Sequence, residues 1–470
     1  MLRLSVERIA EITAGRLVSG DPSAPVNGVS IDSRSVEPGN LFVALPGERV
    51  DGHGFVGQAV DAGARAVLVT REDDAVLQAV RASRNPDAGI VVVEDAIAAV
   101  QALAAYHRSR LLCPVVGVTG STGKTTTKDF LKAVLATTYR VVATEGNRNN
   151  ELGVPLTVLS AGADTGVLIV EMAMRGPGQI AELARIARPT HGLVTNVGLS
   201  HVGVLGSEQA IADAKGELVE AVPESGVVFL NGDDAWTPLL SGKARARIVT
   251  YGLADACDVR ATDVVVDERG FPVFALVRGD ECFEVVLPVL GKHNVYNALA
   301  AAAVAFELGV AGGSIASGLA KATMSGMRMD VFEAACGVTV INDAYNANPS
   351  SMKAALAALL DLPVQGKRVA VLGDMAELGS LSELAHFQLG EEVARSGIDA
   401  LVTVGTLARR IADGARAEGM DPDAIRPCAT PEEASEVLDD LLERGDAVLV
   451  KASRVMGLER VVEGIVKPHV

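Results

Sequence analysis

The sequence is poor in cysteine and aromatic residues, and it has no long uninterrupted apolar run. Its five cysteines are odd in number and form no CxxC pair, which argues against a disulfide scaffold or a thiolate zinc site. No stretch reaches the roughly 18 consecutive apolar residues of a membrane helix, and the first residues lack the apolar core of a secretory signal. These absences predict a cytoplasmic protein with no membrane insertion.

Positive charge is also in short supply. The formal net charge is −17, whereas nucleic-acid binding depends on a basic surface, so we expect no nucleic-acid partner. An anionic substrate would need Lys, Arg or Mg²⁺ concentrated in one cleft. Hydrophobic residues make up 49% of the chain and aromatics only 3%, so the cores must rest on Val, Leu, Ile and Ala. A length of 470 residues predicts about three domains.

Apolar runs divide the chain into three α/β blocks, at residues 1–112, 113–320 and 321–470. The first mixes strand-like runs (41–45, 66–69, 90–93) with helices, the last over 96–110. In the second, buried strands (114–118, 167–170, 192–195, 226–230) alternate with helices, which predicts a P-loop-type parallel sheet. The third has strands at 338–342, 368–372, 400–404 and 446–450 and is expected to be Rossmann-like.

The sharpest local pattern covers residues 115–127, where a buried strand enters a Gly-rich turn and a helix follows. In such a turn the backbone N–H groups surround phosphate oxygens at a helix N-terminus. Lys124 would contact the β- and γ-phosphates, and the Thr125 hydroxyl would bind Mg²⁺. Val118 stands where the longer G-x-x-x-x-G-K pattern has its first glycine. The alternative is an ordinary Gly-rich turn, but the pattern favours nucleotide binding.

Three further residues are metal-ligand candidates, each with a structural alternative. Glu171 ends a predicted parallel strand, where it could bind Mg²⁺ or be a solvated charge. His201 follows another strand in a loop, where histidines are more often structural. Lys215 lies beside the apolar stripe of a helix that Ser207 would cap. It could extend its amine to water or be desolvated, and a neutral amine can form a metal-binding carbamate with CO₂.

These motifs, in this order, resemble the Mur ligase family over essentially the whole chain. Residues 32–34, 38–45 and 51–53 look like its UDP-binding domain, and residues 119–126 match its short phosphate loop. Residues 146–150 resemble the segment that faces the sugar-peptide substrate, and 291–297 the adenine-side motif. Residues 342–352 and 371–379 look like the members that add D-alanyl-D-alanine.

The resemblance implies specific site residues. The nucleotide would be bound by Thr119, Gly120, Ser121, Thr122, Gly123, Lys124, Thr125, Thr126, His293, Asn294, Asn297, Arg328 and Asp343. The other substrates would be bound by Ser33, Arg34, Asn40, His53, Asn147, Asn149, Asn150, Tyr345, Asn346 and Asn348. Two Mg²⁺ sites would use Thr125, Glu171, His201 and carbamylated Lys215, and catalysis would depend on Lys124, Lys215, His201 and Glu171.

The implied activity is an ATP-dependent ligation in peptidoglycan precursor synthesis by a monomeric enzyme. D-alanyl-D-alanine would be joined to UDP-N-acetylmuramoyl-tripeptide through an acyl phosphate, giving the UDP-linked pentapeptide, ADP and phosphate. Hinged closure of the three blocks is expected to exclude water from that intermediate. The residues leave three alternatives open: a folylpolyglutamate synthetase-like enzyme, a nucleotide-hydrolysing switch and a non-catalytic UDP-sugar-binding scaffold.

Overall fold

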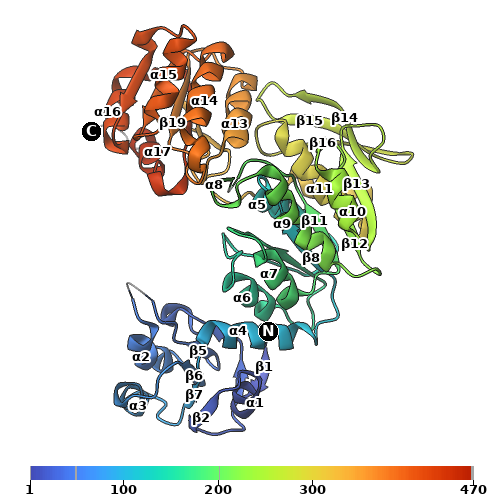
Figure 1. The fold of residues 1–470 in the computed structure, drawn as a ribbon, viewed down its shortest axis with the longest axis vertical. Helices are drawn as coiled ribbons and strands as arrows, with labels where there is room; N and C mark the ends of the chain where they lie inside the picture. The colour runs from blue at the N-terminus through green and yellow to red at the C-terminus, as the bar shows by residue number, and fades with distance from the viewer. Residues whose placement is uncertain (1, 48–49, 201, 467–470) are drawn as a thin grey trace.

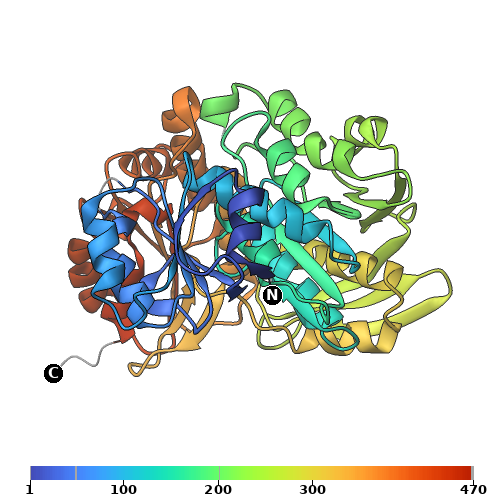
Figure 2. The same cartoon turned by 90° about the horizontal axis from the view of Figure 1, so that it is seen from below.

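The computed structural model describes residues 2–47, 50–200 and 202–466, which form three α/β blocks in succession. The N-terminal (blue) and C-terminal (orange to red) blocks lie on the same side of the central block (green to yellow), so that the chain has a C shape (Figure 1). The view from below shows the same arrangement (Figure 2). None of the helices in the described ranges has the length and apolar character needed to cross a membrane.

The N-terminal block is built on a five-stranded sheet of order β2-β7-β6-β5-β4, parallel except for β2 at the edge. The strands predicted at 41–45, 66–69 and 90–93 are confirmed as β5, β6 and β7, whose buried Val, Leu and Ile side chains form its core. Its elements are β1 (Arg3–Ser5), α1 (Val6–Ile12), β2 (Arg16–Ser19), β3 (Pro25–Asn27), β4 (Val29–Ser30), β5 (Leu41–Val43), α2 (Val56–Asp61), β6 (Ala66–Val69), α3 (Asp74–Arg81) and β7 (Gly89–Val92).

Helix α4 (Ala96–Arg108) joins this block to the central one. It begins where the Asp95 carboxylate accepts the N–H groups of Ile97 and Ala98, which is a standard helix N-cap. At its other end the buried Arg108 guanidinium donates to three backbone carbonyls, those of Leu111, Ala187 and Arg188. Leaving these buried carbonyls without their charged donor would cost free energy of folding, so the hydrogen bonds hold the N-terminal and central blocks together.

The central block contains a nine-stranded sheet of order β16-β15-β14-β13-β12-β11-β8-β10-β9. The predicted parallel arrangement holds from β9 to β14, and β15 and β16 extend it as an antiparallel hairpin that the sequence analysis did not foresee. The strands are β8 (Val115–Thr119), β9 (Val141–Ala143), β10 (Val167–Glu171), β11 (His191–Val194), β12 (Val227–Asn231), β13 (Arg247–Gly252), β14 (Val259–Val266), β15 (Pro272–Arg278) and β16 (Glu281–Val286).

Helices cover both faces of this sheet. One face carries α5 (Lys124–Leu135), α11 (His293–Glu307) and α12 (Gly312–Ala320), and the other α6 (Gly153–Ser160), α7 (Gln179–Ala187), α9 (Glu208–Ala221) and α10 (Thr237–Lys243). Strand β8 lies between β10 and β11. The chain runs from β8 to β9 on one side of it, and from β10 to β11 on the other side. The carboxyl end of β8 is therefore a topological switch point, which is where ligands bind in such sheets.

The C-terminal block is a second doubly wound domain, as predicted, with sheet order β17-β18-β22-β19-β20-β21. All pairs are parallel except β17 with β18. Its elements are β17 (Asp330–Glu333), β18 (Thr339–Asn342), α13 (Pro349–Asp361), β19 (Arg368–Gly373), α14 (Ser382–Ser396), β20 (Ala400–Val404), α15 (Arg409–Ala417), β21 (Ile425–Cys428), α16 (Pro431–Leu441), β22 (Ala447–Lys451) and α17 (Glu459–Val466).

Candidate functional site

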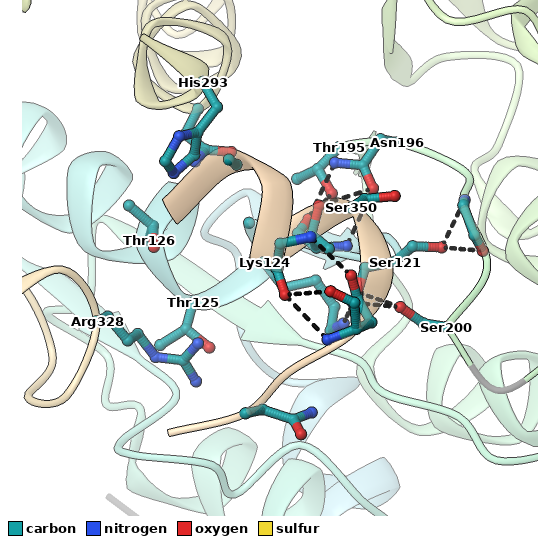
Figure 3. A pocket seen from close by; sticks show the side chains of 18 of the residues that line it. Ser121, Lys124, Thr125, Thr126, Thr195, Asn196, Ser200, His293, Arg328 and Ser350 are labelled. Atoms are coloured by element: carbon teal, nitrogen blue, oxygen red, sulfur yellow. Dashed lines mark hydrogen bonds between the residues drawn. The ribbon is translucent and has the colours of Figure 1, made fainter. Parts of the chain in front are cut away.

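A cavity of about 530 Å³ lies where the central and C-terminal blocks meet (Figure 3). Its wall combines the turn after β8, the carboxyl ends of neighbouring strands, the start of α11, the segment that follows β18 and the end of β22. Of the predicted site residues, the following line it: Ser121, Thr122, Gly123, Lys124, Thr125, Thr126, Asn147, Asn149, Glu171, His293, Asn294, Asn297, Arg328, Asp343, Tyr345, Asn346 and Asn348.

The turn between β8 and α5 requires glycine at two positions. Gly120 has φ +154°, and a Cβ there would lie 1.8 Å from the Thr195 hydroxyl oxygen. Gly123 precedes α5 in the left-handed conformation, and its Cβ would lie 2.2 Å from Oδ1 of Asn297. Val118 is instead buried within β8, paired with its neighbours, which explains why no glycine stands there.

The turn is braced by residues that the sequence analysis did not single out. The Asn196 side chain accepts the Thr122 N–H at 3.0 Å, and its backbone carbonyl accepts the Ser121 N–H at 3.0 Å. The Thr195 hydroxyl donates to the Thr122 carbonyl at 2.6 Å. Both residues directly follow β11, the neighbour of β8, so the rule that ligands gather at carboxyl strand ends could have indicated them.

Lys124 begins α5 at the edge of the turn. Its ammonium donates to the Gly120 carbonyl at 2.7 Å. The positive charge therefore lies beside the turn whose backbone N–H groups are predicted to bind phosphate. Burial lowers the pKa of Lys124, the nearby carboxylate of Glu171 opposes this shift, and the positive charge of Arg328 adds to it. An anion in the cavity would favour the charged amine.

Glu171 is 1% exposed at the end of β10. Its Oε1 accepts the Thr125 hydroxyl at 3.2 Å and the Asn149 amide at 2.7 Å, whereas the buried Oε2 has no partner among the described residues. An ionised carboxylate oxygen buried without a partner is costly, and a cation would satisfy it. A hydroxyl and a carboxylate beside a phosphate loop are hard oxygen ligands, so the residues present fit Mg²⁺.

Lys215 lies on α9, which begins after the predicted N-cap Ser207. The interpretation that its amine extends to water is wrong, because the residue is 1% exposed. Burial, with a smaller effect of the charge on Lys124, holds the pKa of Lys215 well below its usual range. Within the described ranges, no hydrogen bond or ion pair involves its amine, so the neutral form is favoured. His201 lies outside the described residues.

The start of α11 lies on another side of the turn. The His293 ring contacts the cavity, and burial lowers its pKa to about 4. Asn297 donates to the Oδ1 of Asn294 at 2.7 Å and accepts the Thr127 hydroxyl at 3.2 Å. Asn294 donates in turn to the Leu290 carbonyl. These two asparagines therefore position α11 against α5, beside the turn between β8 and α5.

The C-terminal block contributes a cationic wall. The Arg328 guanidinium stacks over the Tyr345 ring at 3.9 Å, and its buried Nε has no partner among the described residues. Lys451, at the end of β22, pairs with Asp343 and donates to the Asn346 carbonyl at 3.0 Å. Lys451 was not among the predicted site residues, although its place at the end of a buried strand could have indicated it.

The remaining predicted residues lie elsewhere. Thr119 ends β8 and Gly120 follows it, immediately before the lining residue Ser121. The Asn150 side chain accepts the Gly153 N–H at the start of α6. In the N-terminal block, Arg34 pairs with Asp32 and holds the pKa of that carboxyl at about 2. Ser33 donates to Gln58, and the buried Asn40 donates to the Asn27 carbonyl. His53 is buried, with Nδ1 2.6 Å from Asp51 and Nε2 accepting the Thr70 N–H.

A phosphate turn at a switch point, a buried carboxylate beside it and cations from a second doubly wound domain define a nucleotide-dependent enzyme of several domains. Comparison with known proteins gives its family. Three family models match: "Mur ligase family, catalytic domain" (residues 25–108), "Mur ligase middle domain" (118–305) and "Mur ligase, glutamate ligase domain" (327–454). The chain belongs to the Mur ligase family.

Individual members of the family are similar to this chain over nearly its whole length. A UDP-N-acetylmuramoyl-tripeptide–D-alanyl-D-alanine ligase from Bacillus subtilis is 39% identical, and the match covers 99% of each chain. A crystal structure of MurF from Acinetobacter baumannii is 30% identical, with a TM-score of 0.87 over 99% of each chain. The MurF ligase from Thermotoga maritima in complex with ADP is 30% identical, with a TM-score of 0.78 over 94% of this chain and 97% of that one.

Proposed function

We propose that this protein catalyses the ATP-dependent joining of D-alanyl-D-alanine to UDP-N-acetylmuramoyl-tripeptide, giving the UDP-linked pentapeptide, ADP and phosphate. The observation that carries the proposal is the match, over essentially the whole chain, to ligases named for this reaction. The cavity between the central and C-terminal blocks supplies a phosphate turn and a cationic wall suited to it. The cytoplasmic location and monomeric state expected from the sequence stay predictions.

The chemistry must bring a carboxylate and ATP, both anions, within bonding distance. At about 4 Å two like charges repel by roughly 4 kcal/mol when the effective dielectric is near 20. Lys124 and Arg328, which both line the cavity, offset this repulsion. Thr125 and Glu171 would hold Mg²⁺, which supplies further neutralisation of the phosphate oxygens. The second predicted site would use Lys215 and His201.

The reaction then has two steps. The terminal carboxylate oxygen of the tripeptide forms a bond to the γ-phosphorus, and the bond to the ADP oxygen breaks. The amine of D-alanyl-D-alanine next attacks the acyl carbon, phosphate leaves, and the amine loses its proton. The backbone N–H groups of the turn and the Lys124 ammonium stabilise the charge on the transferred phosphoryl group.

We assign the three blocks different substrates. Residues 1–112 would bind the UDP part through Ser33, Arg34, Asn40 and His53, and residues 113–320 would bind ATP. Residues 321–470 would bind the dipeptide near Tyr345, Asn346 and Asn348, while Asn147, Asn149 and Asn150 would face the sugar-peptide. The match of residues 25–108 to a Mur ligase model disfavours the folylpolyglutamate synthetase-like alternative, which would not need a UDP-binding block.

Phosphate release with ATP, Mg²⁺ and UDP-N-acetylmuramoyl-tripeptide, with and without D-alanyl-D-alanine, tests the proposal when product mass is also determined. The expected result is a UDP-linked pentapeptide formed only with the dipeptide. Lys124→Ala should reduce the rate at least about 100-fold, because a charge on the transferred group loses its partner. Turnover with a single amino acid in place of the dipeptide would overturn the substrate assignment.

A further inference from the structure

One buried hydroxyl joins the phosphate turn to the C-terminal block. The Ser200 side chain lies on the loop after β11, and its residue is 9% exposed. Its oxygen accepts the Asn348 amide at 2.9 Å and donates to the Ser121 carbonyl at 3.2 Å. A hydrogen-bonded path of two contacts therefore connects the turn, through Ser200, to the residue before α13.

Both ends of this path are fixed by further hydrogen bonds. Ser121 exchanges two hydrogen bonds with Gly198, at 2.8 and 3.0 Å, so the loop and the turn move together. Asn348 accepts the Ser351 N–H at 2.9 Å in a capping box, which leaves only its amide nitrogen for Ser200. Since both partners are held by their own blocks, a shift of α13 is transmitted to the turn.

We propose that Ser200 is a positioning residue, which aligns the phosphate turn with the dipeptide-binding block through Ser121 and Asn348. The inference rests on the proposed function for its catalytic consequence, but the coupling itself is a property of the free protein. Ser200 touches neither substrate in this role. It acts through the turn, so that phosphoryl transfer is fastest when α13 has docked.

Amide hydrogen exchange tests the coupling without any substrate. Asn348→Ser keeps a good helix cap but is too short to reach Ser200. In the full-length protein this change, made in the C-terminal block, should accelerate exchange in residues 121–124 of the central block about three- to tenfold, the size expected for one net hydrogen bond. Ser200→Ala should have a similar effect, and the double variant should be no worse than either single one.

A matched control exists in another contact between the same blocks. Lys292 and Asp361 form an ion pair at 3.1 Å that touches neither the loop nor the turn. Asp361→Asn should leave exchange in residues 121–124 unchanged. Additive effects of Ser200→Ala and Asn348→Ser, or an equal effect of Asp361→Asn, would overturn the coupling.

The catalytic consequence is measured separately. Ser200→Ala should lower kcat about three- to tenfold at saturating substrates, and it should raise the ratio of phosphate released to peptide formed, because water reaches a misaligned acyl phosphate. Wild-type protein that makes no peptide would contradict the proposed function and leave the exchange result standing. A normal kcat and ratio in Ser200→Ala, with active wild type, would contradict the positioning role alone.

Discussion

At the scale of single residues, Glu171 is the clearest case of a side chain whose surroundings are incomplete without a cation. Glu171→Gln removes the charge but keeps the size, so the fold should persist while the affinity for Mg²⁺ falls. We expect kcat to drop at least about 100-fold and the Mg²⁺ concentration for half-maximal activity to rise, measured by phosphate release across a Mg²⁺ titration. An unchanged Mg²⁺ dependence would show that Glu171 holds no metal.

His293 gives a prediction about pH. Its folded-state pKa of about 4 lies below its ordinary value of 6.5, so its contribution to stability is complete above pH 6.5 and is lost as pH falls through 4. Because the ring is partly open to the cavity, the effect should be about 1 kcal/mol rather than the full value of the shift.

His293→Gln carries no such titration. Its free energy of unfolding should therefore fall less steeply than that of the wild type between pH 6.5 and 4, as measured by urea denaturation at fixed ionic strength. Parallel curves for the two proteins would contradict the assignment. His191, whose pKa burial also lowers, is present in both proteins, so the difference between the two curves reports His293.

The site residues that could be predicted from the sequence are those whose interaction partners lie close to them in the sequence. Lys124 and Thr125 begin the helix that directly follows the glycine turn, and Ser207 caps the helix that it immediately precedes, so a short window of sequence contains the cause. Asn196 and Lys451 act on partners more than 70 residues away, Thr122 and Asp343, and only the sheet order brings them there. Burial of Lys215 likewise depends on packing between elements.

At the scale of elements, the short helix α8 (Val202–Leu205) packs on the 3₁₀ turn Gly379–Leu381 of the C-terminal block. Gly203 donates its N–H to the Glu377 carbonyl at 3.2 Å. A Cβ at Gly203 would lie 2.6 Å from the Gly379 nitrogen and 2.8 Å from that carbonyl oxygen. Backbone atoms cannot rotate away, so Gly203→Ala must displace one block from the other.

We therefore expect Gly203→Ala to lower kcat about tenfold, because small misplacements of reacting groups are costly, while the melting temperature changes by less than about 2 °C. Steady-state kinetics and thermal unfolding give the two values. Gly242→Ala on α10 is the matched control, since a Cβ there meets nothing within 4 Å. Equal kinetics for the two variants would show that α8 does not set the arrangement of the blocks.

The elements themselves were predicted with uneven success, for a physical reason. Buried parallel strands such as β8 and β22 are continuous apolar runs, and such runs are visible without knowledge of the fold. Strands β14 to β16 mix buried positions with partly exposed and exposed ones, and β15 and β16 form an antiparallel extension at the sheet edge. Their pattern is weaker, and their pairing depends on strands far from the phosphate turn.

At the scale of the whole molecule, the two junctions between blocks differ in strength. Arg108 is buried and donates to three carbonyls, so the N-terminal and central blocks should move as one body. The central and C-terminal blocks meet through separate contacts, among them the hydrogen bond from Ser325 to Asp129 and the Lys292–Asp361 ion pair. They are joined by a linker in which Met327 and Met329 have positive φ. Closure on substrates should therefore displace the C-terminal block.

Two native thiols allow this movement to be measured. Cys282 in the central block and Cys336 in the C-terminal block are both exposed, so a donor and an acceptor dye can be attached to them. Energy transfer between them should change when a non-hydrolysable ATP analogue and the UDP-linked tripeptide are added. A second pair, Ser23→Cys with Cys282 in a Cys336→Ser background, should report no change, because Ser23 belongs to the N-terminal block. A change in the second pair would mean that the Arg108 contacts do not make the N-terminal and central blocks one body. No change in the first pair would mean that the C-terminal block does not move when substrates bind.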